Sequence, residues 1–136
     1  MLDSIKHLVE VLSELSCEFK KVESERLAQD LIAFRLRIRG LDVKRRVRLE
    51  SQKYPDVEVD ILLPDVALEI KVGKRFYDGF GQALAVRELY GLNSCIVHLV
   101  EQADEKHASG LRALASKLGI KAILMSLRDC RVEVVG

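Results

Sequence analysis

The sequence contains no tryptophan, only three tyrosines and four phenylalanines, and no long apolar run. No stretch approaches the roughly 20 apolar residues that cross a bilayer, so the chain is not predicted to enter a membrane. Acidic residues interrupt the short apolar groups of the N-terminus, which is untypical of a secretory leader, and we expect an unprocessed cytoplasmic protein. The few scattered aromatics also argue against a stacking platform for single-stranded nucleic acid.

Cysteine and histidine are too sparse to define a metal or disulfide scaffold. Cys17, Cys95 and Cys130 are odd in number, far apart and never arranged as CxxC. The pattern therefore predicts neither a disulfide framework, nor a zinc ribbon, nor an iron–sulfur site. The three histidines lack zinc-binding spacing, and we expect His98 in its apolar strand and His107 in its helix to be structural or exposed.

The 136 residues, 49% of them hydrophobic, suit one globular domain and exclude a two-domain enzyme. Charge is nearly balanced overall, at +1, but basic residues gather between positions 35 and 48 and face only Asp42 there. They are Arg35, Arg37, Arg39, Lys44, Arg45, Arg46 and Arg48. A polyanion such as DNA is a candidate partner, and a solvated helix end and loop is an equally weighted reading.

Hydrophobic periodicity predicts a mixed α/β fold in which helices cover a central sheet. The expected helices cover residues 3–19, 24–39, 80–90 and 104–118, and the expected strands lie near 47–49, within 57–72 on both sides of a turn, and at 94–100, 121–125 and 131–135. The second helix is expected to carry one apolar face. This face consists of Leu27, Leu31, Phe34 and Ile38.

Residues 57–72, VEVDILLPDVALEIKV, predict an antiparallel hairpin that turns at Pro64 and Asp65. In a symmetric hairpin, positions whose numbers sum to 129 lie opposite each other, which pairs Asp60 with Glu69. Side chains two apart on a strand share a face, so Lys71 and Glu58 join this charged face. The opposite face is apolar.

Opposed carboxylates are destabilising unless a cation compensates them. Mg²⁺ suits this role, with Mn²⁺ as a substitute, because it takes one or two protein carboxylates and leaves other positions to water and phosphate. Lys71 would then position or deprotonate an attacking water, or neutralise charge on the phosphate. The tripeptide [DE]-x-K alone is weak, since it occurs four times in the chain, and a purely structural Lys–Glu face is the alternative.

The D-x8-E-I-K pattern across a hairpin, after a helix bearing Glu and before a helix with an early Gln, resembles the PD-(D/E)xK nuclease superfamily. This superfamily includes restriction endonucleases and archaeal Holliday-junction resolvases. The resemblance covers residues 23–100, with residues 1–22 as an N-terminal helix and 101–136 as a C-terminal helix and strands. It implies a restriction-endonuclease-like central mixed sheet flanked by helices. It also implies Asp60, Glu69 and the backbone carbonyl of Ile70 as metal ligands, and Lys71 as the catalytic lysine.

The resemblance places the helix-borne carboxylate at Glu25, with Glu23 as the second choice, to hold metal or a metal-bound water. From the residues alone, Glu25 is an ordinary first-turn carboxylate favoured by the helix dipole. Gln82 matches the early glutamine, whose catalytic role would be a contact to substrate or to the active-site water. The Q-x-x-x-Y pattern of some branches is not met, because Val86 stands at the tyrosine position and Tyr90 lies a turn further on.

Together these features predict a Mg²⁺-dependent DNA endonuclease, resolvase- or restriction-like, acting on duplex or branched DNA. Arg45, Arg46, Lys74 and Arg75 are the candidate phosphate contacts. The KVGKR segment lacks the spacing of a P-loop, which disfavours nucleotide hydrolysis. We expect a homodimer formed through the N-terminal helix, and an additional partner protein is an open alternative. The competing functions are a catalytically inactive DNA-binding or assembly module and an RNA-processing nuclease.

Overall fold

The computed structural model describes residues 2–18, 24–73 and 75–136, and shows an α/β protein with a six-stranded mixed sheet. The strands are β1 (Lys44–Leu49), β2 (Val57–Leu62), β3 (Ala67–Val72), β4 (Ser94–Val100), β5 (Lys121–Ser126) and β6 (Arg131–Val134). The helices are α1 (Asp3–Glu18), α2 (Glu25–Ile38), α3 (Phe80–Tyr90) and α4 (Glu105–Leu118). The predicted element order and fold class are confirmed at this level.

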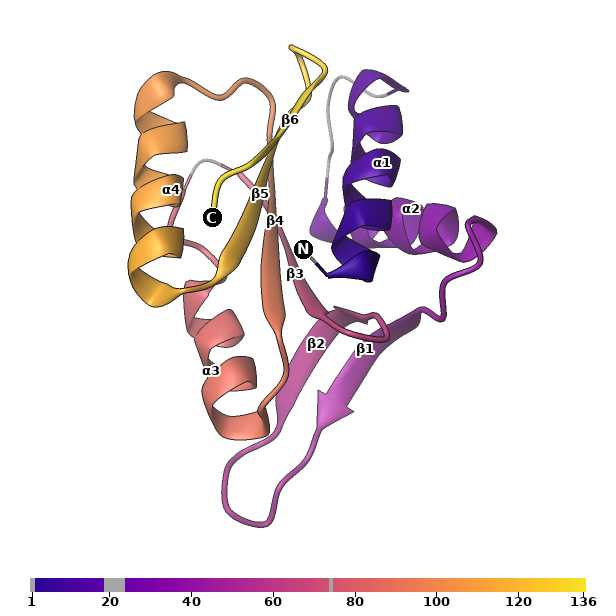
Figure 1. Ribbon diagram of the computed structural model, residues 1–136, viewed down its shortest axis with the longest axis vertical. Helices are drawn as coiled ribbons and strands as arrows, with labels where there is room; N and C mark the ends of the chain where they lie inside the picture. Colours follow the sequence, from indigo (N-terminus) through magenta and orange to yellow (C-terminus); the bar gives the residue numbers. More distant parts are fainter. Residues whose placement is uncertain (1, 19–23, 74) are drawn as a thin grey trace.

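The strands lie in the order β1-β2-β3-β4-β5-β6. β3, β4 and β5 run parallel to one another. β2 pairs antiparallel with β3, β1 pairs antiparallel with β2, and β6 pairs antiparallel with β5. Helices α1 and α2 cover one face of the sheet and α3 and α4 cover the other (Figure 1). β4 is buried along its whole length, as its unbroken apolar run predicted.

Helix α1 uses its apolar face within the monomer. Five of its apolar side chains are at most 1% exposed and lie in the core beneath the helix: Ile5, Leu8, Val11, Leu12 and Leu15. The helix that was expected to support dimerisation therefore buries its apolar face inside the chain, and the homodimer stays a prediction. Helix α4 begins at the predicted cap, where the Asp104 carboxylate accepts a hydrogen bond from the His107 amide, and it ends at Gly119.

Helix α2 turns the opposite face to the core from the one we expected. Its buried residues are Ala28, Gln29, Ile32, Ala33 and Leu36. The predicted core face points outward instead, with Leu27, Phe34 and Ile38 among the most exposed large apolar side chains of the described chain. α2 carries two apolar stripes, and the smaller side chains of the inner one fit beside α1 and the sheet.

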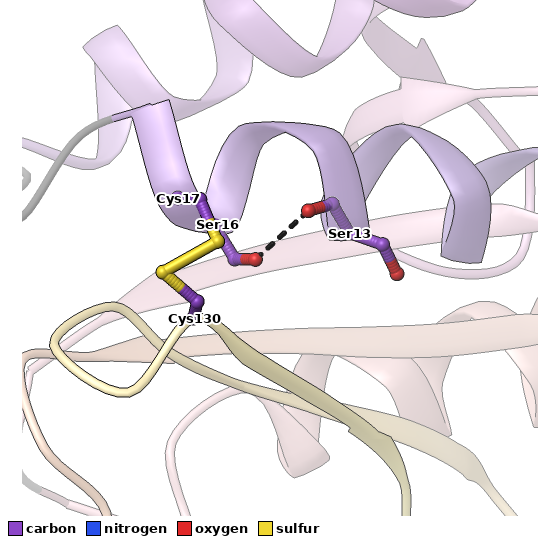
Figure 2. The surroundings of a disulfide bond; sticks show 4 residues. All are labelled: Ser13, Ser16, Cys17 and Cys130. Atoms are coloured by element: carbon purple, nitrogen blue, oxygen red, sulfur yellow. Dashed lines mark hydrogen bonds between the residues drawn. A yellow bond between two sulfur atoms is a disulfide. The ribbon is translucent and has the colours of Figure 1, made fainter.

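The expectation of no disulfide was wrong for one pair, because Cys17 and Cys130 are disulfide-bonded. The disulfide joins the last turn of α1 to the turn between β5 and β6, across 113 residues, with a Cα–Cα distance of 4.7 Å (Figure 2). Beside it, the Ser16 hydroxyl donates to the Ser13 carbonyl oxygen at 3.0 Å. Disulfides are uncommon in the reducing cytosol, so the Cys17–Cys130 disulfide weighs against the expected cytoplasmic location. That location stays a prediction.

None of the described helices is both long and apolar enough to cross a membrane. Cys95 is a free, buried cysteine on β4, where burial raises the pKa of its thiol to about 12. A thiol that holds its proton so firmly is a poor nucleophile and a poor metal ligand.

Candidate nuclease-like site

The predicted hairpin register is confirmed at its tip, where Ile61 lies opposite Leu68 and Leu62 opposite Ala67. One residue further from the turn, the Asp60 carboxylate, rather than a backbone carbonyl of β2, accepts the hydrogen bond from a β3 amide. Its Oδ2 accepts a hydrogen bond from the Ile70 amide at 2.8 Å. The carboxylate is thereby held against β3, beside the side chain of Glu69.

Glu69 is the most unusual group of the site, because its side chain is buried at 1% exposure without a hydrogen-bond donor. Neither of its carboxyl oxygens has a hydrogen-bond partner among the described residues. Burial, followed by the nearby negative charge of Asp60, raises the pKa of Glu69 to about 8. Asp60 thus acts on Glu69 chiefly through its charge.

Asp60 responds to the same surroundings. Burial raises its pKa, the Ile70 amide and Lys71 lower it, and Glu25 raises it further. Removing charged groups from water disfavours their ionised form, and like charges nearby add to that effect. The site therefore holds more carboxylate than its cationic side chain, Lys71, can neutralise.

Lys71 lies on β3 two residues after Glu69, on the face that α3 covers. Gly79, the residue before α3, makes room for it: a Cβ atom at Gly79 would lie 3.1 Å from Cγ of Lys71. The φ angle of +90° at Gly79 is also one that side-chain-bearing residues rarely adopt. This glycine thus allows the backbone to pass close over the lysine.

Glu25 reaches the same region from α2. The helix begins behind Ser24, whose hydroxyl accepts a hydrogen bond from the Leu27 amide at 3.1 Å. Glu25 Oε1 accepts from the Val72 amide at 3.4 Å, and its charge acts on Asp60. The structure therefore brings Glu25, Asp60, Glu69 and Lys71 together, whereas the second choice, Glu23, lies outside the described residues.

Within the described ranges, no group of three or more histidine, cysteine, aspartate and glutamate side chains is arranged to hold a metal ion. Asp60 and Glu69 form a pair, and Glu25 bonds to backbone. A pair still meets the need of Mg²⁺, which takes one or two carboxylates and completes its shell with water and phosphate oxygens. The unpartnered oxygens of buried Glu69 fit such an ion, because a cation would compensate both the lost hydration and the repulsion from Asp60.

The other predicted site residues are less well placed. Gln82 is exposed on α3, and the structure shows no hydrogen bond from it to the described carboxylates. Val86, at the position of the family's tyrosine, is buried in the core, and Tyr90 donates to the Pro55 carbonyl oxygen at 2.9 Å. The role of Gln82 stays a prediction that no contact supports.

Intramolecular ion pairs occupy much of the basic stretch. Arg45 pairs closely with Asp30, and Arg46 lies 3.7 Å from the same carboxylate. Arg75 pairs with Asp78 at 3.2 Å and remains 70% exposed, while Lys74 lies outside the described residues. Phosphate contact by the two strand arginines would thus compete with Asp30, whereas Arg75 is accessible.

Ion pairs also join α2 to helix α1. Arg35 and Arg39 on α2 and its C-terminal cap bond to acidic side chains of α1, namely Glu10, Glu14 and Glu18. The apparent basic excess of the stretch is therefore partly neutralised by a helix that is remote in sequence. This reduces the weight of charge alone as an indication of nucleic-acid binding.

Sequence reasoning missed the place of His98. In the parallel register of β3 and β4, His98 lies beside Lys71, and its Nε2 donates to the Gly73 carbonyl oxygen at 3.0 Å. Its ring packs edge-on against His107 with centroids 4.9 Å apart, and burial lowers the pKa of both imidazoles. The alternation of β4 puts His98 on one face, but only the register shows that Lys71 is its neighbour.

A pocket of about 570 Å³ opens next to this pair, at the carboxyl ends of β3, β4 and β5. Its polar lining includes Glu101, Gln102, His107 and Arg128, and Gly73 forms part of its wall. The pocket therefore adjoins the segment that follows Lys71.

No protein-family model, curated protein or solved structure matches the chain. What the chain does must therefore be inferred from the site itself.

Proposed function

We propose that this protein is a metal-dependent DNA endonuclease with a restriction-endonuclease-like fold. The observation that carries the proposal is the buried Glu69 carboxyl group, which has no described hydrogen-bond donor and lies between Asp60 and Lys71. A buried acidic pair costs folding free energy and is found where its chemistry is used. The resemblance of the D-x8-E-I-K hairpin to PD-(D/E)xK nucleases supports the same reaction.

Asp60, Glu69 and the Ile70 carbonyl oxygen are the groups that would hold Mg²⁺ or Mn²⁺, with Glu25 beside them. When bound, the ion supplies Lewis-acid stabilisation of the negative charge that develops on the phosphate. The Ile70 amide holds Asp60 in place, and the Val72 amide does the same for Glu25. Lys71 Nζ donates hydrogen bonds to the attacking water or to a phosphate oxygen, and Gly79 leaves it room to do so.

The substrate is expected to lie along the segment after β3. Arg75 is exposed there and offers a sequence-independent contact to phosphate. His98 fixes the Gly73 carbonyl and hence the start of this segment. Burial lowers the pKa of His98, so the imidazole is neutral at pH 7, and the hydrogen bond to the Gly73 carbonyl oxygen places its proton on Nε2.

The test is cleavage of labelled duplex, single-stranded, flap and four-way-junction DNA, with matched RNA substrates, in Mg²⁺ or Mn²⁺ and with EDTA as a control. We expect metal-dependent DNA products from the wild type and a loss of at least about 100-fold in Lys71→Ala, on the scale of removing one group that stabilises the transition state. Lys53→Ala, in the exposed loop between β1 and β2, is the matched loss of a positive charge and should retain activity.

Each failure has its own meaning. Cleavage of RNA but not DNA would change the substrate class. Binding of DNA without cleavage on any substrate would support the inactive module instead. Equal activity of Lys71→Ala and Lys53→Ala would show that this site takes no part in cleavage.

A further inference from the structure

The outer face of α2 carries an apolar stripe that the described chain leaves uncovered. Leu27, Phe34 and Ile38 are 44%, 60% and 65% exposed, and Leu31 lies between them. The spacings of four, three and four residues are those of a heptad seam, in which such positions insert between the side chains of a facing helix. Contiguous exposed apolar surface of this kind marks an interaction site more often than isolated residues do.

The seam is suited to a second copy of itself. In an antiparallel pair of α2 helices related by a two-fold axis, facing positions have numbers that sum to about 65. Leu27 then meets Ile38 of the other copy, and Leu31 meets Phe34. Each layer then joins a leucine of one copy to Ile38 or Phe34 of the other, and the side chains of one helix fit between those of the other.

The charges beside the seam favour the same arrangement. Asp30 and Arg37 lie on one edge of the stripe, seven residues apart, too distant to pair within one helix. In the antiparallel pair, Asp30 of each copy faces Arg37 of the other, which gives two opposite-charge contacts by symmetry. A parallel pair would bring this edge against the opposite edge of the other copy's stripe, so Asp30 and Arg37 would not meet.

From this we propose that the protein forms a two-fold homodimer through antiparallel packing of α2 against α2 of a second copy. This interface does not depend on the proposed nuclease reaction. It does determine the placement of the two sites, because Glu25 is the first residue of a 14-residue helix about 21 Å long. The Glu25 residues would stand at opposite ends of the paired helices, roughly 20 Å apart along their axis.

The interface is small. A single helix pair buries less than the roughly 1,200 Å² of a standard interface, so we expect a dissociation constant of about micromolar order. Sedimentation equilibrium of the full chain, from about 1 µM to about 500 µM, spans that range. The wild type should change from monomer to dimer across it.

Phe34→Ala should weaken dimerisation at least about 10-fold, since aromatic side chains at the centre of an interface contribute most. Tyr77→Ala is the matched control, because Tyr77 is 54% exposed and precedes α3, which covers the other face of the sheet. Both side chains are exposed, so circular dichroism should show both variants folded.

A charge exchange tests the antiparallel register. Asp30→Arg and Arg37→Asp should each weaken the dimer, and the double variant should recover the wild-type constant within about threefold, equivalent to 0.65 kcal/mol. Within the chain Asp30 pairs with Arg45, and Arg37 donates to the Val43 carbonyl oxygen. The double variant loses both of these contacts, so its recovery reports on the contact between copies. A wild type that stays monomeric throughout, a dimer indifferent to Phe34→Ala, or a double variant without recovery would each overturn the proposal.

Discussion

Replacing Glu69 by glutamine should stabilise the metal-free protein at alkaline pH and remove the part of its pH dependence that Glu69 causes. The folded state binds a proton at Glu69 with a pKa of about 8, against 4.5 for an ordinary glutamate. A raised folded pKa gives stability that is complete below pH 4.5 and is lost as the pH rises through 8. Linkage between these values predicts that the wild type loses stability on the order of 3–4 kcal/mol between pH 5 and pH 8, which Glu69→Gln keeps.

Urea unfolding of both proteins at pH 5, 6.5 and 8 in EDTA measures this difference directly. Other groups titrate in both proteins, so the difference between the two curves isolates the contribution of Glu69 and its coupling to Asp60. Adding Mg²⁺ at pH 8 should then stabilise the wild type and leave the glutamine variant unchanged, because ion binding replaces the proton. Parallel curves for the two proteins, or a variant less stable at pH 8, would refute the account of a buried carboxyl without donors.

Three further outcomes are expected. Reduction should lower the free energy of unfolding of the wild type by about 3 kcal/mol, since the Cys17–Cys130 disulfide closes most of the chain into a loop, while Cys17→Ser should not respond to reductant. Gly79→Ala should lower the free energy of unfolding by about 1–2 kcal/mol in urea and should lower cleavage, because Gly79 has a positive φ and a Cβ atom there would press on Lys71. Gly81→Ala is the control: a Cβ atom at Gly81 meets nothing within 4 Å, so this variant should be neutral or stabilising. Fluorescence-polarisation binding should show that Lys71→Ala still binds DNA within about threefold of the wild type, because one phosphate contact is a small part of the total.

The hairpin was predictable because its signal is local. Alternation of apolar and charged residues on both sides of Pro64–Asp65 defines the register, and the register brings Asp60, Glu69 and Lys71 together. His98 could not be found in the same way. Its position beside Lys71 depends on how β4 aligns with β3, and the intervening helix leaves that alignment undetermined by the sequence.

The orientation of α2 and the disulfide were missed for a related reason. α2 has two apolar stripes. The larger side chains of the stripe that contains Leu31 and Phe34 led us to expect that stripe in the core. The space between α1 and the sheet admits Ala28 and Ala33 instead. Cys17 and Cys130 are neighbours only because α1 lies across the β5–β6 end of the sheet, which is a long-range packing outcome.

A structural explanation of Glu69 is hard to sustain. An apolar side chain at this buried position would remove the desolvation cost and the repulsion from Asp60, and core substitutions of that type are often stabilising. The charge of Lys71 relieves only part of this cost, and the Ile70 amide bonds to Asp60 rather than to Glu69. A group kept at such expense, next to a lysine for which Gly79 makes room, is best explained by a ligand that the carboxylates bind together, and a divalent cation has the charge and the oxygen preference to be that ligand.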